Sequence, residues 1–134
     1  MTLLVDTSVW SLALRRDQSS KAAQVQALRE ALLGDEIVVT TGLILQELLH
    51  GFAGPRARNE IVERFTALPL LVPDRRDHID AAELRNDCRR AGIQVGTIDA
   101  LLAQLWLRHQ LVMLTTDQDF SRIATRSKLK IWKQ

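Results

Sequence analysis

The chain has 134 residues, of which 46% are hydrophobic and 25% are charged, a composition typical of one folded domain rather than of a disordered segment. Its net charge of +2 is too small to indicate a nucleic-acid-binding protein by itself. The sequence contains no apolar run that could span a bilayer, no signal-peptide pattern, and no Cys and His residues at zinc-site spacing. We therefore expect a cytoplasmic protein with one domain over residues 1–134 and no structural zinc.

The first part of the chain predicts one strand and two helices. Residues 3–5 form a short apolar run that predicts the strand, and the apolar residues around Trp10 predict the first helix. A second helix is expected to be capped by Ser19 or Ser20 and to end at Gly34. The residues expected on its buried face are Ala22, Val25, Leu28 and Leu32.

The middle of the chain continues this alternation. Residues 37–39 are β-branched and predict a second strand, after which Thr40 or Thr41 is expected to cap a helix. A further helix is predicted before Pro69, because proline cannot continue a helix. Residues 70–72 predict a third strand.

The last part predicts three helices and two strands. In chain order these are a helix at 77–91, a helix at 98–107, a strand at 111–114, a helix at 117–125 and a strand at 129–132. Ile79, Ala82 and Leu84 are expected to face inward on the first of these helices. The second is apolar on nearly all sides and is expected to be buried.

Strands that alternate with helices predict an α/β fold. Parallel strands need crossover connections, so we expect a mostly parallel sheet of about five strands with helices on both faces. The carboxyl ends of such strands open onto one edge, where these folds bind ligands. Asp6 directly follows the first strand, and Asp117 follows the fourth by a short turn. If these strands are neighbours, both carboxylates face the same crevice.

The acidic residues of this pattern also have structural explanations. Asp6 and Asp117 are placed to cap helices, and Asp99 stands near the positive end of a helix, so capping and function carry equal weight for each. Glu47 differs because apolar neighbours flank it on both sides, which predicts partial burial and favours a paired or metal-bound carboxylate. The hydroxyls of Thr7, Thr97 and Thr116 are suited either to orient ligands or to cap helices.

Several carboxylates in one crevice would repel one another unless a cation offsets their charge. With only oxygen ligands on offer, Mg²⁺ or Mn²⁺ fits such a cluster, whereas zinc would be expected to recruit His or Cys. Mg²⁺ keeps several of its waters and commonly meets substrate phosphates. Phosphodiester hydrolysis is therefore the reaction class that the residues favour.

Four segments of the sequence resemble the four blocks of PIN domains, in the same order: residues 5–10 (VDTSVW), 46–51 (QELLHG), 96–103 (GTIDALLA) and 114–120 (LTTDQDF). The resemblance runs from residue 2 to near the C-terminus. It implies a metal-dependent ribonuclease, and at this length it implies the VapC-type toxin of a toxin–antitoxin pair.

The resemblance also implies the site and the partners. The four matched acids, Asp6, Glu47, Asp99 and Asp117, would hold Mg²⁺ or Mn²⁺. Asp119 offers a second acid in the last block, and we favour Asp117 as the direct ligand. The implied partners are an RNA substrate, a VapB-like antitoxin and a second copy of the chain in a homodimer.

Two other functions remain open. A phosphoryl-transfer protein with an aspartate nucleophile also places Asp6 after the first strand, although Ser8 stands where haloacid-dehalogenase-like phosphatases carry a second Asp. A PIN-fold binding module without catalysis would be expected to lack some of the acids, and none of the four is missing.

Basic residues add a weaker signal. Arg85, Arg89 and Arg90 fall at helical spacing, which favours a solvated helix face over a phosphate-binding stripe.

Overall fold

The five strands of the computed structural model form one parallel sheet in the order β3-β2-β1-β4-β5, and the structure describes residues 1–15 and 22–134. They are β1 (Thr2–Val5), β2 (Ile37–Thr41), β3 (Leu70–Leu71), β4 (Val112–Leu114) and β5 (Lys130–Ile131). The predicted α/β class and the five predicted strands are confirmed. Because the chain adds β2 and β3 on one side of β1 and β4 and β5 on the other, β1 is central.

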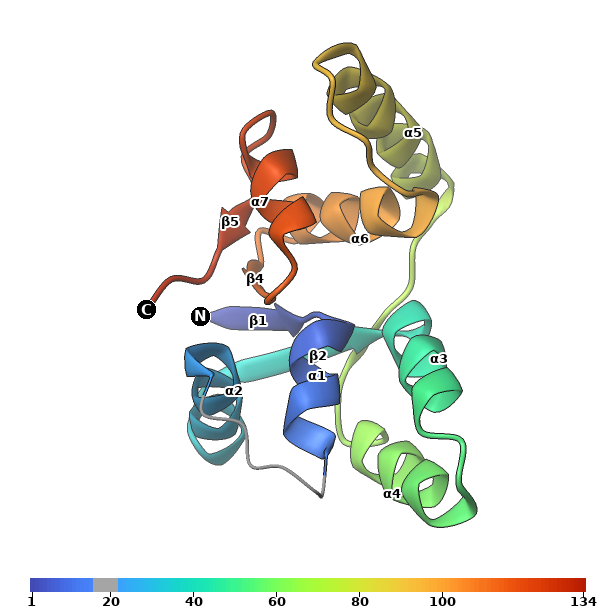
Figure 1. Cartoon of the computed structure of the whole chain (residues 1–134), viewed down its shortest axis with the longest axis vertical. Helices are drawn as coiled ribbons and strands as arrows, with labels where there is room; N and C mark the ends of the chain where they lie inside the picture. The colour runs from blue at the N-terminus through green and yellow to red at the C-terminus, as the bar shows by residue number, and fades with distance from the viewer. Residues whose placement is uncertain (16–21) are drawn as a thin grey trace.

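Helices connect and flank these strands. In the described residues they are α1 (Thr7–Leu14), α2 (Ala23–Leu33), α3 (Gly42–Gly51), α4 (Pro55–Phe65), α5 (Arg75–Arg90), α6 (Thr97–Arg108) and α7 (Gln118–Ala124). Figure 1 shows α1 to α4 grouped on the β2 side of β1, and α5 to α7 on the β4 side. None of the helices within residues 1–15 and 22–134 is long and apolar enough to cross a membrane.

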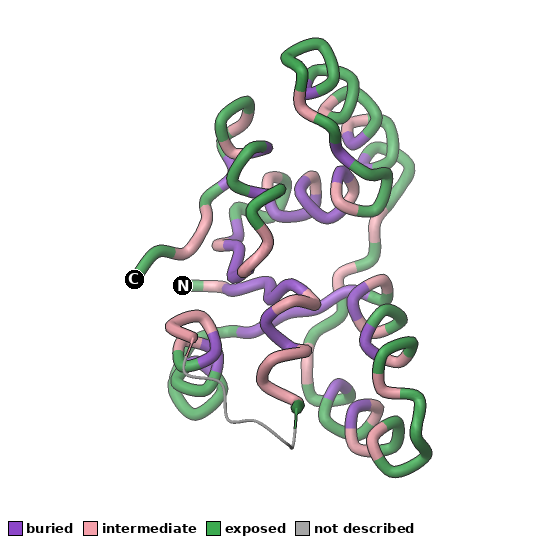
Figure 2. The backbone as a smooth tube through the Cα atoms, in the orientation of Figure 1, coloured by how far each residue is buried: buried purple, intermediate pink, exposed green. Residues whose placement is uncertain are grey.

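Buried side chains of α6 and of the central strand form part of the core. The side chains of Leu3, Leu4 and Val5 are buried, and Figure 2 shows most of this strand in the colour of buried residues. The indole Nε1 of Trp106 donates a hydrogen bond to the carbonyl oxygen of Leu4 at 3.1 Å. As predicted, α6 buries most of its apolar residues. Burial of a large side chain contributes roughly 1.5–3 kcal/mol, so this packing fixes α6 firmly on the sheet.

Two predictions about the start and the face of α2 meet different outcomes. Ser19 and Ser20, the expected caps, lie outside the described residues, and the helix begins at Ala23. The residues that it buries are Val25, Leu28 and Ala31. Leu32 was expected to be buried as well, but it is 49% exposed. Ala31, its neighbour in the last turn of α2, is buried instead.

The predicted buried face of α5 is also wrong in part. Ile79 and Ala82 are exposed and Leu84 is partly buried, and the helix instead buries Asp77, Ala81 and Cys88. The carboxylate of Asp77 is buried because it accepts the backbone N–H of Asp74 and pairs with the guanidinium of Arg108 on α6. Hydrophobic periodicity counts an aspartate as a surface residue, so it shifts the predicted face of the helix away from the real one.

Candidate metal centre

The strand order brings the ends of β1 and β4 together. Val5 lies opposite Leu114 in the parallel register, and the backbone N–H of Asp6 donates to the carbonyl oxygen of Leu114 at 2.9 Å. The condition under which Asp6 and Asp117 face the same crevice, that the first and fourth strands are neighbours, is therefore met. Asp6 and the turn that carries Asp117 both leave the sheet at this edge, where the order of the strands along the chain changes direction.

The carboxylate of Asp6 is buried and held by two hydroxyl groups. Its Oδ2 atom accepts a hydrogen bond from Ser8 Oγ at 2.8 Å and another from Thr115 Oγ1 at 2.9 Å. Ser8 Oγ also accepts the backbone N–H of Thr116 at 3.1 Å. Asp6 stands at the N-cap position of α1 but makes no capping hydrogen bond with its side chain. Its orientation is therefore set by contacts between the two strand ends.

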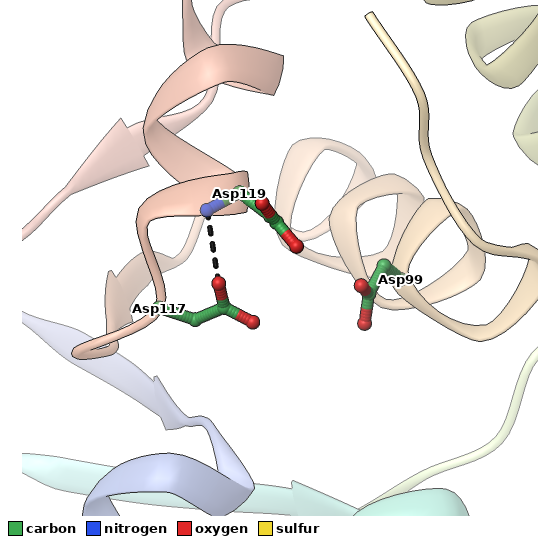
Figure 3. A group of neighbouring side chains, drawn as sticks. All are labelled: Asp99, Asp117 and Asp119. Atoms are coloured by element: carbon green, nitrogen blue, oxygen red, sulfur yellow. Dashed lines mark hydrogen bonds between the residues drawn. The ribbon is translucent and has the colours of Figure 1, made fainter.

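Three further aspartates gather beside this edge. Asp99 extends from the first turn of α6, while Asp117 and Asp119 extend from the start of α7. One carboxylate oxygen from each lies within 4.8 Å of the others, and Figure 3 shows the three side chains around one space. Asp117 does cap α7, since its Oδ1 accepts the N–H of Asp119 at 2.9 Å. Capping and membership of the cluster thus coexist in one residue.

Asp99 experiences the charges of all the other candidate acids. Burial raises its pKa, and the negative charges of Asp117, Asp6, Glu47 and Asp119 raise it further, to about 6. Its position at the N-terminus of α6 does not outweigh these effects. The four predicted acids and Asp119 therefore form one electrostatic unit, with Asp99 at its centre.

Glu47 is the least enclosed member of this unit. The residue is exposed, contrary to the expectation of partial burial, because α3 packs into the core through Ile44 and Leu48 and Glu47 lies off that face. Its carboxyl group is nevertheless partly desolvated, and this burial together with the charge of Asp6 raises its pKa, while His50 lowers it. Glu47 thus lies near the cluster without belonging to its tightest group.

The hydroxyls that orient Asp6 differ from those expected. Thr7 Oγ1 is buried without a hydrogen-bond partner, and Thr116 contributes only its backbone N–H to this network. The residues that bind the carboxylate are Ser8 and Thr115. Thr115 directly follows β4, and Asp6 directly follows β1. The pairing of these two strands is therefore the signal that could have identified Thr115 as a neighbour of Asp6.

A hard divalent cation fits this group of side chains. Within the described part of the chain, the acids whose oxygens come closest offer three carboxylates and no His or Cys ligand. Burial is the largest cause of the raised pKa of Asp99, and repulsion from the neighbouring carboxylates, which a divalent cation would relieve, adds to it. Oxygen ligands of this kind suit Mg²⁺ or Mn²⁺.

Comparison with known proteins agrees with this architecture. A family model described as PIN domain matches residues 3–126. The structure is similar to DNA-bound VapBC from Salmonella typhimurium, with a TM-score of 0.74, 20% identity and coverage of 98% of this chain and 97% of that one. No curated protein sequence matches the chain significantly.

Two solved structures from Mycobacterium tuberculosis are also similar. VapBC-5, described as a member of the VapBC family of toxin-antitoxin systems, has a TM-score of 0.69 and 22% identity, covering 99% of this chain and 98% of that one. VapC20, described as a sarcin-ricin loop cleaving toxin, has a TM-score of 0.65 and 21% identity, covering 89% and 92%. At these identities the likeness shows a shared fold.

The raised pKa of Asp99 predicts how metal-free stability depends on pH. In the folded protein the pKa of about 6 lies above the ordinary value of 3.8 for an aspartate, so the folded protein favours the protonated acid. The stability that this preference contributes is complete below about pH 4 and is lost as the pH rises through about 6. In EDTA, Asp99→Asn should therefore melt at a higher temperature than the parent at about pH 8, and at a similar temperature at about pH 4.

A matched control is Glu83→Gln, which removes one exposed carboxylate of α5 outside the cluster. It should show no such pH-dependent difference. Added Mn²⁺ should raise the melting temperature of the parent and of Glu83→Gln more than that of Asp99→Asn. Equal differences between parent and Asp99→Asn at both pH values, with equal responses to Mn²⁺, would show that Asp99 is not at the centre of the cluster.

Proposed function

This chain belongs to the PIN domain family, and we propose that it is a metal-dependent endoribonuclease that acts as the toxin of a VapBC-type toxin–antitoxin pair. The observation that carries the proposal is the convergence of Asp99, Asp117 and Asp119 beside Asp6, at the edge of the sheet where β1 and β4 end. The similar fold of VapC20, described as a cleaving toxin, supports the same activity.

We propose that Asp6, Asp99 and Asp117 hold the metal, with Asp119 as a further ligand and Glu47 beside it. Bound Mg²⁺ or Mn²⁺ would lower the pKa of a water and offset negative charge on the phosphate. Ser8 and Thr115 keep the carboxylate of Asp6 directed while the site is loaded.

Glu47 is suited to handle the proton of the attacking water. Its pKa is raised by partial burial and by Asp6, which makes its carboxylate a stronger base than an ordinary surface glutamate. In the hydrolysis the water oxygen would form a bond to phosphorus while one P–O bond of the RNA backbone breaks; Glu47 would take a proton from the water, and the departing oxygen would be protonated by solvent to a hydroxyl. No protein nucleophile is needed for this reaction.

The two alternative functions receive less support. In receiver-type phosphoryl-transfer proteins the strand order is 2-1-3-4-5, whereas this sheet has the order 3-2-1-4-5. Ser8 does not replace the second acid of a phosphatase, because its hydroxyl donates to Asp6. A binding module without catalysis would not need five carboxylates whose charges meet at Asp99.

The toxin role rests on the comparisons. VapBC-5 is described as belonging to toxin-antitoxin systems, and its chain and this one cover each other almost completely. We propose a VapB-like antitoxin and a second copy of this chain as protein partners, and the cytoplasm as the place of action. An arginine of the antitoxin would be able to neutralise the acidic cluster in place of the metal, because its guanidinium binds carboxylates with two hydrogen bonds.

Cleavage of a loop-containing RNA tests the enzymatic part of this proposal. With Mn²⁺ or Mg²⁺ the parent and Glu83→Gln should cut the RNA equally well. Asp6→Asn, Asp99→Asn and Glu47→Gln should each lower the rate by at least about 100-fold, since groups that act as a unit fail together. Glu47→Gln should still be stabilised by Mn²⁺, because the variant lacks the proposed base but keeps Asp6, Asp99 and Asp117, which are proposed to hold the metal.

EDTA should abolish cleavage by the parent. Cleavage that survives EDTA, or that continues at the parental rate in Asp99→Asn, would contradict a metal-dependent reaction at this site. The melting temperature of each variant confirms that a lost rate does not reflect a lost fold.

Expression in cells tests the toxin role. Production of the parent should slow growth, and production of folded Asp99→Asn should not, because the phenotype requires cleavage. Co-expression of the cognate VapB-like antitoxin should restore growth. Normal growth during production of parent protein that cleaves RNA after purification would argue against the toxin role while leaving the nuclease activity intact.

A further inference from the structure

A groove lies between α5 and the segment that joins α5 to α6. Arg85, Arg89 and residues 92–96 line it, and its volume is about 700 Å³, within the range of binding sites for small ligands. Figure 1 shows this segment running beside α5 to the start of α6. The groove ends at Gly96, the N-cap residue of α6, and Asp99 lies in the first turn of that helix. One end of the groove therefore lies at the residue that begins the helix of Asp99.

The two arginines of the groove lack acidic partners among the described residues. Arg85 Nε donates a hydrogen bond to the carbonyl oxygen of Val95 at 2.9 Å, which fixes the guanidinium without neutralising it. The side chain of Arg89 makes no hydrogen bond or ion pair with any residue that the structure describes. By contrast, Arg90 on the same helix pairs with Asp87. Arg85 and Arg89, which line the groove, therefore have no carboxylate to offset their charge among the described residues, whereas Arg90 has one.

The lining of the groove suits a phosphate backbone. A guanidinium binds a phosphate with two parallel hydrogen bonds, and Arg85 is already oriented by its contact with Val95. No aromatic side chain lines the groove, so it offers no platform on which a base would stack. A Cβ atom added at Gly92 or Gly96 would meet nothing within 4 Å, which shows that this side of the groove is open.

We propose that this groove binds the phosphate backbone of the RNA strand beside the phosphate that is cleaved, a proposal that rests on the ribonuclease function above and extends it. The acidic cluster repels a polyanion, so a strand that enters it needs cations close by. Arg85 and Arg89 supply them at the approach to Asp99. An acidic segment of a protein partner would also be attracted here, but the position of the groove at the helix that carries Asp99 favours the substrate.

Binding of a fluorescent single-stranded RNA tests the proposal in an Asp99→Asn background, in which the RNA is not cut. Adding Arg89→Ala should weaken binding about tenfold and lower the slope of log affinity against log salt by about 1, since one phosphate contact is lost. Adding Arg90→Ala is the matched control. It removes a neighbouring, already paired arginine and should change the affinity little.

Cleavage by otherwise unaltered protein gives the second measurement. Arg89→Ala should raise KM and leave kcat close to the parental value, because the contact lies away from the reacting bond. Arg89→Glu should have a larger effect in the same direction, and melting temperatures should stay close to that of the parent because Arg89 has no structural contact.

The outcomes separate this proposal from the function on which it rests. If the parent cleaves RNA but Arg89→Ala binds and cleaves like Arg90→Ala, the groove is not an RNA site although the nuclease function stands. Loss of antitoxin binding by Arg89→Ala with unchanged RNA affinity would assign the groove to the protein partner and overturn the proposal. If the parent does not cleave RNA at all, the proposed function itself fails.

Discussion

Several carboxylates that repel one another lie at one edge of the sheet, and the rest of the structure has to hold them there. Burial raises the pKa of Asp99, and the charges of Asp117, Asp6, Glu47 and Asp119 raise it further, to about 6. Such an arrangement opposes folding at neutral pH unless the surrounding structure holds the acids in place. The buried central strand, the hydrogen bond from Trp106 to Leu4 and the hydroxyls of Ser8 and Thr115 provide that support.

A second set of charges secures the helices next to this site. Buried Asp77 on α5 pairs with Arg108 near the end of α6, and Asp74 contributes to the same ion pair. Because the side chain of Arg108 is 42% exposed, removing one partner should cost less than the roughly 3–5 kcal/mol that is typical of fully buried pairs. The contact holds α5 against the helix that carries Asp99. It thereby also positions the side of α5 on which Arg85 and Arg89 line the groove.

Much of the fold was predictable because its signals are local. The run that ends in Val5 predicts a buried strand, and the acid after it then falls at the edge where parallel strands open. The same reasoning identified Asp117 beyond β4, whereas Asp99, at the start of a buried helix, was assigned to the site through the resemblance to PIN domains. Asp6 and Asp117 lie at the same edge because β1 pairs with β4. The sequence does not predict this pairing, and the expected crevice depended on it.

The errors have the opposite origin, since each depends on a partner distant in sequence. Asp77 is buried because it pairs with Arg108. The two residues are 31 positions apart in the sequence, and hydrophobic periodicity does not detect a pair of this kind. The role of Thr115 toward Asp6 exists only once the two strand ends are neighbours. Glu47 is exposed because the packing of Ile44 and Leu48 sets the orientation of α3. The groove, likewise, depends on how the segment after α5 returns along that helix.

The central claim is that these carboxylates hold a divalent cation, and a crystal of the protein grown with Mn²⁺ tests it most directly. Anomalous scattering locates Mn²⁺ independently of any assumption about the site. The account predicts one or more peaks bound by carboxylate oxygens of Asp6, Asp99 and Asp117, and the map would also show whether Asp119 or Glu47 is a direct ligand. If the carboxylates are ordered in the crystal but no anomalous peak lies among them, at an Mn²⁺ concentration sufficient for RNA cleavage, they do not hold the metal.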